Sequence, residues 1–127
     1  RFEKPQRGEV IVFNQPTEKK YLIKRIIGLP GETIEIKGDV VTIVNNDRPN
    51  GFTLDEPYIA PENKRDANLR ITLALDEYFV LGDNRRASAD SRAWGALPRD
   101  HIIGRALVRL YPFNQLSLNP GNIDFDE

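Results

Sequence analysis

One lysine lies inside an otherwise apolar stretch of the chain. Lys24 follows Leu22 and Ile23, and Ile26 and Ile27 come shortly after it. The β-branched and apolar residues predict a strand over 21–27, so alternate side chains share a face and Lys24 lies on the face of Leu22. Burial of that face would disfavour the charged ammonium, and a neutral amine in a dry pocket can act as a general base. The alternative is an edge-strand lysine that reaches solvent or guards against aggregation.

A second stretch is dense in polar side chains that can form a network. Residues 82–95 read Gly-Asp-Asn-Arg-Arg-Ala-Ser-Ala-Asp-Ser-Arg-Ala-Trp-Gly and follow an apolar run at 77–81. Asp90 can pair with Arg92 there, and the serine hydroxyls can orient a neighbouring group. A surface turn capped by Asp, Asn and Ser side chains has the same composition, so this alternative stays open.

Other common site chemistries find little support in the sequence. His101 is the only histidine and no Gly-x-Ser-x-Gly is present, which argues against a Ser-His-Asp hydrolase. Asp83 and Asp90 share a loop, yet nothing singles them out as paired catalytic carboxylates. Cysteine is absent, and no phosphate-binding or calcium-binding loop motif occurs. We therefore expect neither a metal nor a cofactor.

Short strands separated by turn residues predict an all-β fold with almost no helix. Strands are expected at 8–13, 21–27, 33–37, 40–44, 77–81 and 102–108, with 33–44 forming a hairpin through Lys37-Gly-Asp39. The only plausible helix is 61–74, although its periodicity is weak and a polar loop leading into 69–75 is the alternative. Residues 1–112 are expected to form one domain, followed by a loosely ordered tail at 113–127.

The bulk composition sets further limits. The chain has 127 residues and a net charge of −1, which gives no reason to expect nucleic-acid binding. No stretch approaches the ~20 apolar residues that a membrane-spanning helix needs. The sequence starts at Arg1 and contains no methionine, so we expect it to be part of a longer product.

Three stretches of this chain resemble the bacterial type I signal peptidases, membrane-anchored serine-lysine proteases that remove signal peptides from exported proteins. Residues 7–13, Arg-Gly-Glu-Val-Ile-Val-Phe, are similar to the family's Arg-Gly-Asp-Ile-Val-Val-Phe. Residues 24–32, Lys-Arg-Ile-Ile-Gly-Leu-Pro-Gly-Glu, resemble its Lys-Arg-x-x-Gly-Leu-Pro-Gly-Asp box. Residues 82–92 resemble its Gly-Asp-Asn-Arg-Asp-Asn-Ser-x-Asp-Ser-Arg box, and residues 54–58 look like the segment that precedes it. The boxes occur in the family's order.

The resemblance implies a compact, antiparallel and barrel-like β core, and a role for each site residue. Lys24 matches the general base, which takes a proton from the serine nucleophile and returns one to the leaving amine. Ser88 matches the hydroxyl that orients this lysine. The site loop contributes Asp83, Asn84, Arg85, and the ion pair of Asp90 with Arg92. The strand that pairs with the extended substrate matches Tyr21, Leu22 and Ile23.

The sequence also departs from the family pattern. The family's nucleophile lies in a Ser-x-Ser-Met-x-Pro-type box after a membrane anchor, and neither feature occurs in this sequence. Arg86 and Ala87 replace the Asp-Asn of the last box. Ser88 matches the supporting hydroxyl, so it is not promoted to nucleophile. We therefore expect an N-terminally truncated catalytic domain that cannot cleave as it stands.

The resemblance further implies partners and a location. The substrates would be signal peptides of exported preproteins, and the domain would sit on the extracytoplasmic face of the bacterial cell membrane. Two alternatives remain open: a self-cleaving repressor-type Ser/Lys protease, against which the Gly-Asp-Asn-Arg loop speaks, and a pseudo-protease that binds exported peptides without cutting them.

Overall fold

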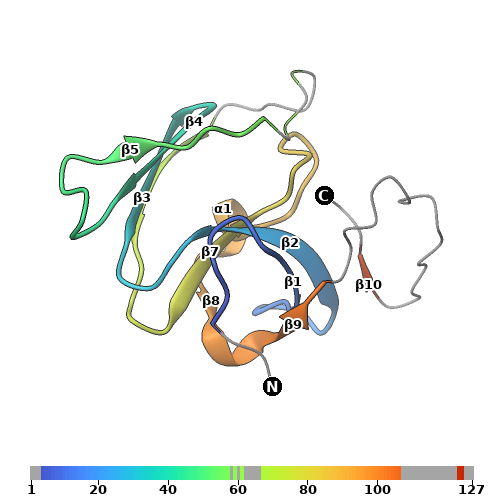
Figure 1. Cartoon of the computed structure of the whole chain (residues 1–127). Helices are drawn as coiled ribbons and strands as arrows, with labels where there is room; N and C mark the ends of the chain where they lie inside the picture. Colours follow the sequence, from blue (N-terminus) through green and yellow to red (C-terminus); the bar gives the residue numbers. More distant parts are fainter. Residues whose placement is uncertain (1–3, 58, 60, 62–66, 107–122, 125–127) are drawn as a thin grey trace.

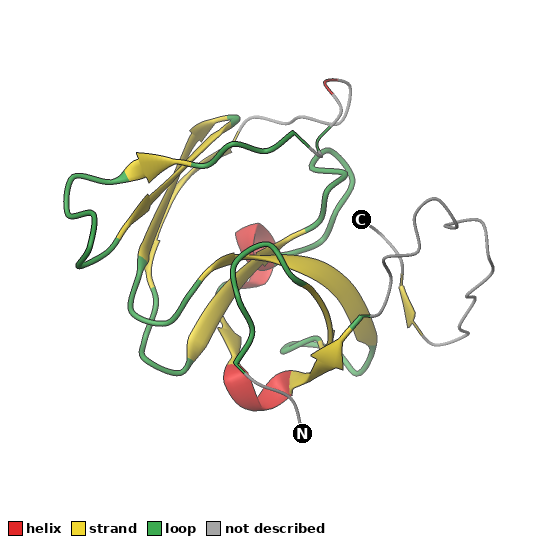
Figure 2. Ribbon diagram, viewed as in Figure 1, coloured by secondary structure: helices red, strands yellow, loops and turns green. Residues whose placement is uncertain are grey.

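The computed structural model describes residues 4–57, 59, 61, 67–106 and 123–124, which form two β-sheets with little helix (Figure 1, Figure 2). The first sheet has the order β8 (Leu97–Pro98), β7 (Glu77–Leu81), β2 (Tyr21–Gly28), β1 (Val10–Asn14) and β9 (Ile102–Arg105), and β10 (Ile123–Asp124) pairs with β2. The second has the order β5 (Phe52–Thr53), β4 (Val40–Val44), β3 (Thr33–Gly38) and β6 (Ala67–Thr72). The helical elements include α1 (Ser91–Trp94) and the 3-10 turn η2 (Arg99–His101). The mainly β, antiparallel fold class predicted from the sequence is confirmed.

Strand β2 is central to the first sheet. One of its edges pairs with β1 from Tyr21 to Arg25. Its other edge pairs with β7 only at Arg25, Ile26 and Gly28, and β10 pairs in parallel with its start, at Tyr21 and Leu22. On that edge β10 therefore pairs with the start of β2 and β7 with its end. Lys24 lies between the two paired segments.

Two hydrophobic cores follow from the alternation of side chains along β2 and β7. Ile26 and Val80 belong to the core of the first sheet, whereas Ile27 and Phe79 belong to the core of the second. Successive strand residues point to opposite faces, so these two strands contribute to both cores. The first core comprises Ile11, Phe13, Leu22, Ile26, Tyr78, Val80 and Leu97.

The chain passes from the first sheet to the second through the turn that follows β2. A Cβ atom built on Gly28 would lie 2.4 Å from Ile34 Cδ1 and 3.1 Å from a Leu73 methyl carbon. Gly28 therefore lets the end of β2 pack directly against the second core, which fixes the two sheets at close range. Gly31, with a φ of 81°, completes the turn.

The hairpin predicted over 33–44 is confirmed, with β3 and β4 paired from Thr33–Val44 to Lys37–Val40. The helix predicted over 61–74 is wrong where the structure describes it: residues 67–72 form β6, which pairs along the whole of β3. Leu69 and Ile71 alternate with exposed polar residues, and this period of two fits a strand that covers a core on one face. Residues 62–66 lie outside the described part.

The structure also differs from the prediction at two smaller elements. Helix α1 was not predicted, because it is only 4 residues long. Most of the predicted tail at 113–127 lies outside the described residues; within it, Ile123–Asp124 forms the short strand β10, which was not predicted.

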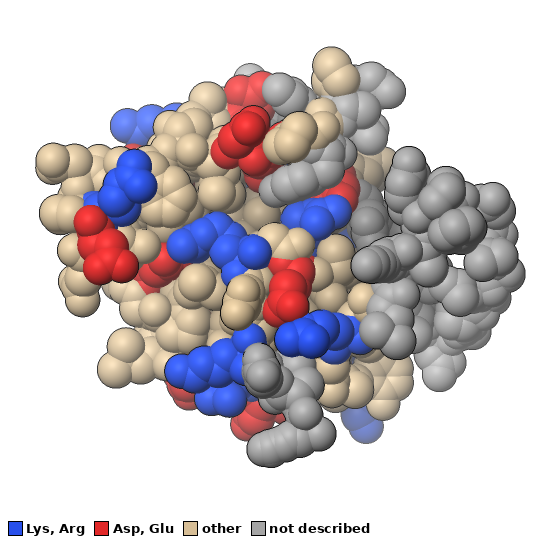
Figure 3. Space-filling model, viewed as in Figure 1, with Lys and Arg blue, Asp and Glu red and all other residues tan. Residues whose placement is uncertain are grey.

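Charged side chains of both signs are interspersed on the face seen in Figure 3. Four of the arginine–carboxylate pairs are bidentate: Arg7 with Glu32, Arg25 with Asp83, Arg85 with Glu56, and Arg92 with Asp90. In each pair two guanidinium nitrogens contact the carboxylate, the geometry that fixes orientation as well as charge. Three of the four pairs involve the loop after β7.

Candidate active site

The Lys24 side chain is fully buried, with 0% of its surface exposed. Its Nζ donates a hydrogen bond to Ser88 Oγ at 2.9 Å, although the two residues lie 64 positions apart in the chain. The interpretation of Lys24 as a solvent-reaching edge lysine is therefore wrong. A buried amine in contact with a hydroxyl is the arrangement that general-base chemistry on a hydroxyl group requires.

The loop that carries Ser88 runs from the end of β7 to the start of α1. Asp90, with 0% exposure, closes the loop on itself, because its carboxylate accepts from the Gly82 amide at 2.9 Å. The same carboxylate caps α1 by accepting from the Arg92 amide at 3.1 Å, and it pairs with the Arg92 guanidinium at 2.8 and 2.9 Å. Ser91 Oγ accepts from the Val80 amide at 3.0 Å and ties the start of α1 to β7.

An ion pair between Asp83 of the loop and Arg25 of β2 attaches the loop to this strand. Arg25 is the residue that follows Lys24. The guanidinium contacts both carboxylate oxygens, at 2.9 and 2.7 Å, and also donates to the Gly8 carbonyl at 2.9 Å. Both side chains are about one-fifth exposed. This pair fixes the first part of the loop relative to the strand that carries Lys24.

Arg85 and Asn84 lie in the middle of the same loop. Arg85 donates from Nε to the Gly82 carbonyl at 2.7 Å, and its Nη atoms contact the Glu56 carboxylate at 2.7 and 3.3 Å. The Asn84 carbonyl accepts from the Ala87 amide at 3.1 Å, while its side-chain Oδ1 is buried without a hydrogen-bond partner among the described residues. Glu56 was not predicted as a site residue: it lies in the family-like segment 54–58, but its pairing with Arg85, 29 positions away, could not be inferred from the sequence.

The three residues predicted to line the substrate strand occupy the start of β2. Tyr21 is 37% exposed, whereas Leu22 and Ile23 are buried. Their outer edge is where β10 pairs, with Ile123 opposite Tyr21 and Asp124 opposite Leu22. The structure thus brings the start of β2, Lys24 and the Ser88 loop together in one region.

Several sequence features lie apart from this arrangement. His101 is partly exposed, and its Nδ1 lies 3.1 Å from the Asn14 carbonyl at the end of β1. Arg86 and Ala87, the two departures from the family box, are exposed. Among the described residues, no cluster of three or more histidine or acidic side chains could bind a metal ion. Within the same part of the chain, no helix has the length and apolarity needed to cross a bilayer.

The sequence is similar to those of known proteins over most of its length. The family model "Signal peptidase, peptidase S26" matches residues 1–111. The chain is 42% identical to a signal peptidase I of Leptolyngbya laminosa over 91% of this chain and 57% of the relative, and 36% identical to signal peptidase I T of Bacillus subtilis over 87% and 60%. It therefore spans somewhat more than half the length of these curated relatives.

The fold is similar to a solved structure as well. The crystal structure of a signal peptidase I from Enterococcus faecalis V583 superposes with a TM-score of 0.69 at 32% sequence identity, covering 84% of this chain and 99% of that one. The sequence match and the fold match therefore cover largely the same region. The chain belongs to the signal peptidase family, peptidase S26.

Proposed function

We propose that this chain is the catalytic domain of an endopeptidase that removes N-terminal signal peptides from exported preproteins by Ser/Lys chemistry. The observation that supports this most directly is the buried Lys24 amine, held 2.9 Å from Ser88 Oγ beside a strand edge. Relatives that match most of this chain are named signal peptidase I. The domain would act on the extracytoplasmic face of the bacterial cell membrane, where exported preproteins emerge.

In the proposed mechanism the neutral Lys24 amine removes the proton of a serine hydroxyl as its oxygen attacks the scissile carbonyl carbon. The resulting ammonium then protonates the leaving amine as the peptide C–N bond breaks, which leaves an acyl-enzyme and a neutral lysine. A water molecule attacks the ester with Lys24 again taking the proton, and the serine is regenerated. Ser88 accepts a hydrogen bond from Nζ and so orients the amine.

The attacking serine is proposed not to be one of the three serines of this chain. Ser88, Ser91 and Ser117 lack a following Met-x-Pro pattern. Ser91 Oγ is engaged with the Val80 amide, and Ser88 already contacts the lysine in the orienting position. We infer that a serine from a segment outside residues 1–127 supplies the nucleophile, so activity is to be assayed in the full-length gene product.

The Ser88→Ala variant of the full-length protein is expected to lower kcat by about 10²-fold without abolishing cleavage, because a misoriented amine retains its basicity. The measurement is cleavage of a fluorogenic signal-peptide substrate at saturating concentration. Thr53→Ala, which removes an exposed hydroxyl, is the matched control and should leave kcat unchanged. A wild-type rate for Ser88→Ala would remove Ser88 from the site, and complete loss would make it the nucleophile.

The substrate is proposed to pair with the start of β2 as an added strand, with its side chains selected by pockets next to Leu22 and Ile23. The pairing of β10 with Tyr21 and Leu22 supports this proposal, because it demonstrates that this edge accepts an extended segment. A peptide that uses the same backbone groups must displace β10. The two segments would therefore compete.

Deleting residues 121–127 is expected to lower the Kd of a signal-peptide-derived peptide for the isolated domain by about tenfold. This value assumes that β10 occupies the edge of β2 in about nine-tenths of the undeleted molecules, so that only about one-tenth can bind the peptide. Fluorescence anisotropy of a labelled peptide measures this. The control peptide carries prolines at alternate positions, which remove the amide donors that strand pairing needs. An unchanged Kd after the deletion would show that peptide and β10 bind different edges.

A further inference from the structure

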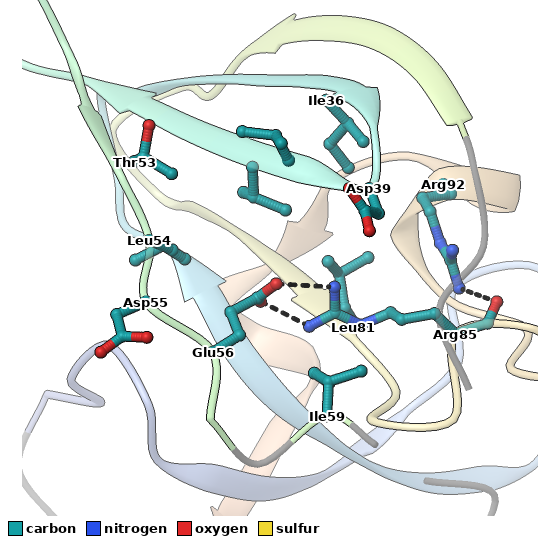
Figure 4. Close-up of a pocket in the computed structure, with 12 residues that line it drawn as sticks. Ile36, Asp39, Thr53, Leu54, Asp55, Glu56, Ile59, Leu81, Arg85 and Arg92 are labelled. Carbon is teal, nitrogen blue, oxygen red and sulfur yellow. Dashed lines mark hydrogen bonds and ion pairs between the residues drawn. The ribbon is translucent and has the colours of Figure 1, made fainter. Parts of the chain in front are cut away.

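The Arg85–Glu56 ion pair connects the Ser88 loop to the second sheet. Glu56 follows β5, whereas Arg85 lies three residues before Ser88 in the loop after β7. The Glu56 side chain is only 11% exposed and the Arg85 side chain 7%. The Glu56 carboxylate and the Arg85 guanidinium approach to 2.7 Å. Figure 4 shows them pointing toward each other, with a second contact between the Arg92 guanidinium and the Arg85 carbonyl.

The contacts of Arg85 lead directly to the groups that hold Ser88. Its Nε donates to the Gly82 carbonyl, and Arg92 donates to the Arg85 carbonyl at 3.0 Å while pairing with Asp90. Two ion pairs attach the loop to other elements: Asp83 binds Arg25 of β2, and Arg85 binds Glu56 beyond β5. Ser88 lies between the second attachment and Asp90.

A cavity of about 240 Å³ lies beside the ion pair. Its lining includes Arg85, Glu56, Arg92 and Leu81 from the site side, and Asp39 from the β3–β4 turn (Figure 4). The ion pair therefore borders open space on one side.

We propose that Glu56 is a positioning residue for the Lys24 base: through Arg85 it holds the loop so that Ser88 Oγ stays within hydrogen-bond distance of Lys24 Nζ. Glu56 does not touch the reacting groups itself. Loss of its charge leaves Arg85 without this carboxylate, shifts the loop, and misorients the amine through Ser88. This inference rests on the proposed function only for its effect on catalysis.

The test compares Glu56→Gln in two backgrounds of the full-length protein. With Ser88 present, kcat is expected to fall by about 10²-fold at unchanged KM, since a displacement of about 1 Å in a catalytic group has this effect. In the Ser88→Ala background the same substitution should cause no further fall in kcat, because the group it acts through is already absent. Equal effects in the two backgrounds would overturn the proposal.

Two further variants separate positioning from a loss of fold. Asp55→Asn is the matched control, because Asp55 is the exposed neighbour that lines the same cavity, and its kcat should remain at the wild-type value. Glu56→Asp keeps the charge on a shorter side chain and should recover part of the lost kcat. A fall with Asp55→Asn as large as with Glu56→Gln, or no recovery in Glu56→Asp, would contradict a specific role of the Glu56 carboxylate.

A readout that does not depend on catalysis uses the 127-residue domain with carbon-13-labelled lysine. The ε-methylene NMR signal of Lys24, assigned from Lys24→Met, should move in Glu56→Gln in the same direction as in Ser88→Ala. An unmoved signal would contradict positioning even if the enzyme proves active. If Lys24→Met cleaves normally while the signal moves, the proposed function fails and the positioning role stands.

Discussion

Replacing Lys24 by methionine is expected to abolish signal-peptide cleavage while leaving the fold intact and no less stable. The loss should reach about 10⁴-fold in kcat, the upper range for general-base catalysis, because methionine has no amine that could take the proton of the attacking serine. Lys24 is fully buried, and methionine fills a similar volume without a polar group that must be hydrogen-bonded, so the free energy of unfolding should not fall appreciably.

The measurement combines cleavage kinetics of the full-length protein with thermal unfolding of the same samples. Lys37→Met is the matched control, since Lys37 lies on β3 with 74% of its side chain exposed, and neither its kcat nor its Tm should change appreciably. Retained cleavage in Lys24→Met would remove the base assignment. A large drop in Tm together with lost activity would instead make Lys24 a structural residue.

The second large effect concerns stability and centres on Glu32, at the turn between the sheets. Its carboxylate is buried and accepts hydrogen bonds from the Arg7 guanidinium at 2.5 and 3.0 Å, from Asn45 Nδ2 at 2.8 Å, and from the Leu29 amide at 2.8 Å. Burial alone would raise the pKa of Glu32, but these hydrogen bonds and the charge of Arg7 outweigh it. The pKa therefore lies below its ordinary value of 4.5.

Glu32→Gln is expected to lower the free energy of unfolding at pH 7 by about 3 kcal/mol, because it leaves the partly buried Arg7 without its carboxylate. Glu35→Gln is the control: Glu35 is more exposed and makes longer ion pairs, at 3.5 and 3.7 Å, so its loss should amount to less than about 1 kcal/mol. Urea unfolding curves of the isolated domain provide both values. Equal losses in the two variants would contradict a special role for Glu32.

The sign of the pH dependence follows from the lowered pKa. Between the folded and unfolded pKa values the unfolded chain binds more protons at Glu32, so stability rises with pH there. The contribution of the Glu32 carboxylate to the free energy of unfolding is complete above pH 4.5. It is lost as the pH falls through the lower pKa of the folded state. The difference between wild type and Glu32→Gln should therefore narrow at pH 3, and a constant difference would contradict this linkage.

The strands were predictable where local pattern and burial agree. The run around Lys24, the 33–44 hairpin and the strand at 77–81 each carry β-branched or aromatic residues bounded by turn residues, and each is observed. The sequence predicts a helix over residues 67–72, as part of 61–74, because the alternation of Leu69 and Ile71 is too short to indicate a strand. Pairing with β3 decides their conformation, and pairing partners cannot be read from a window of six residues.

The candidate site likewise has features that the local sequence shows and features that depend on residues far apart in the chain. The lysine in its apolar strand, the polar loop at 82–95 and the box motifs are properties of the sequence by itself, and they determined the family and the mainly β fold. The full burial of Lys24, its contact with Ser88, the Glu56–Arg85 pair and the position of β10 on β2 were decided only by the tertiary structure. Each of these contacts joins residues 29 or more positions apart, and such contacts depend on which distant strands and loops come together rather than on any local preference.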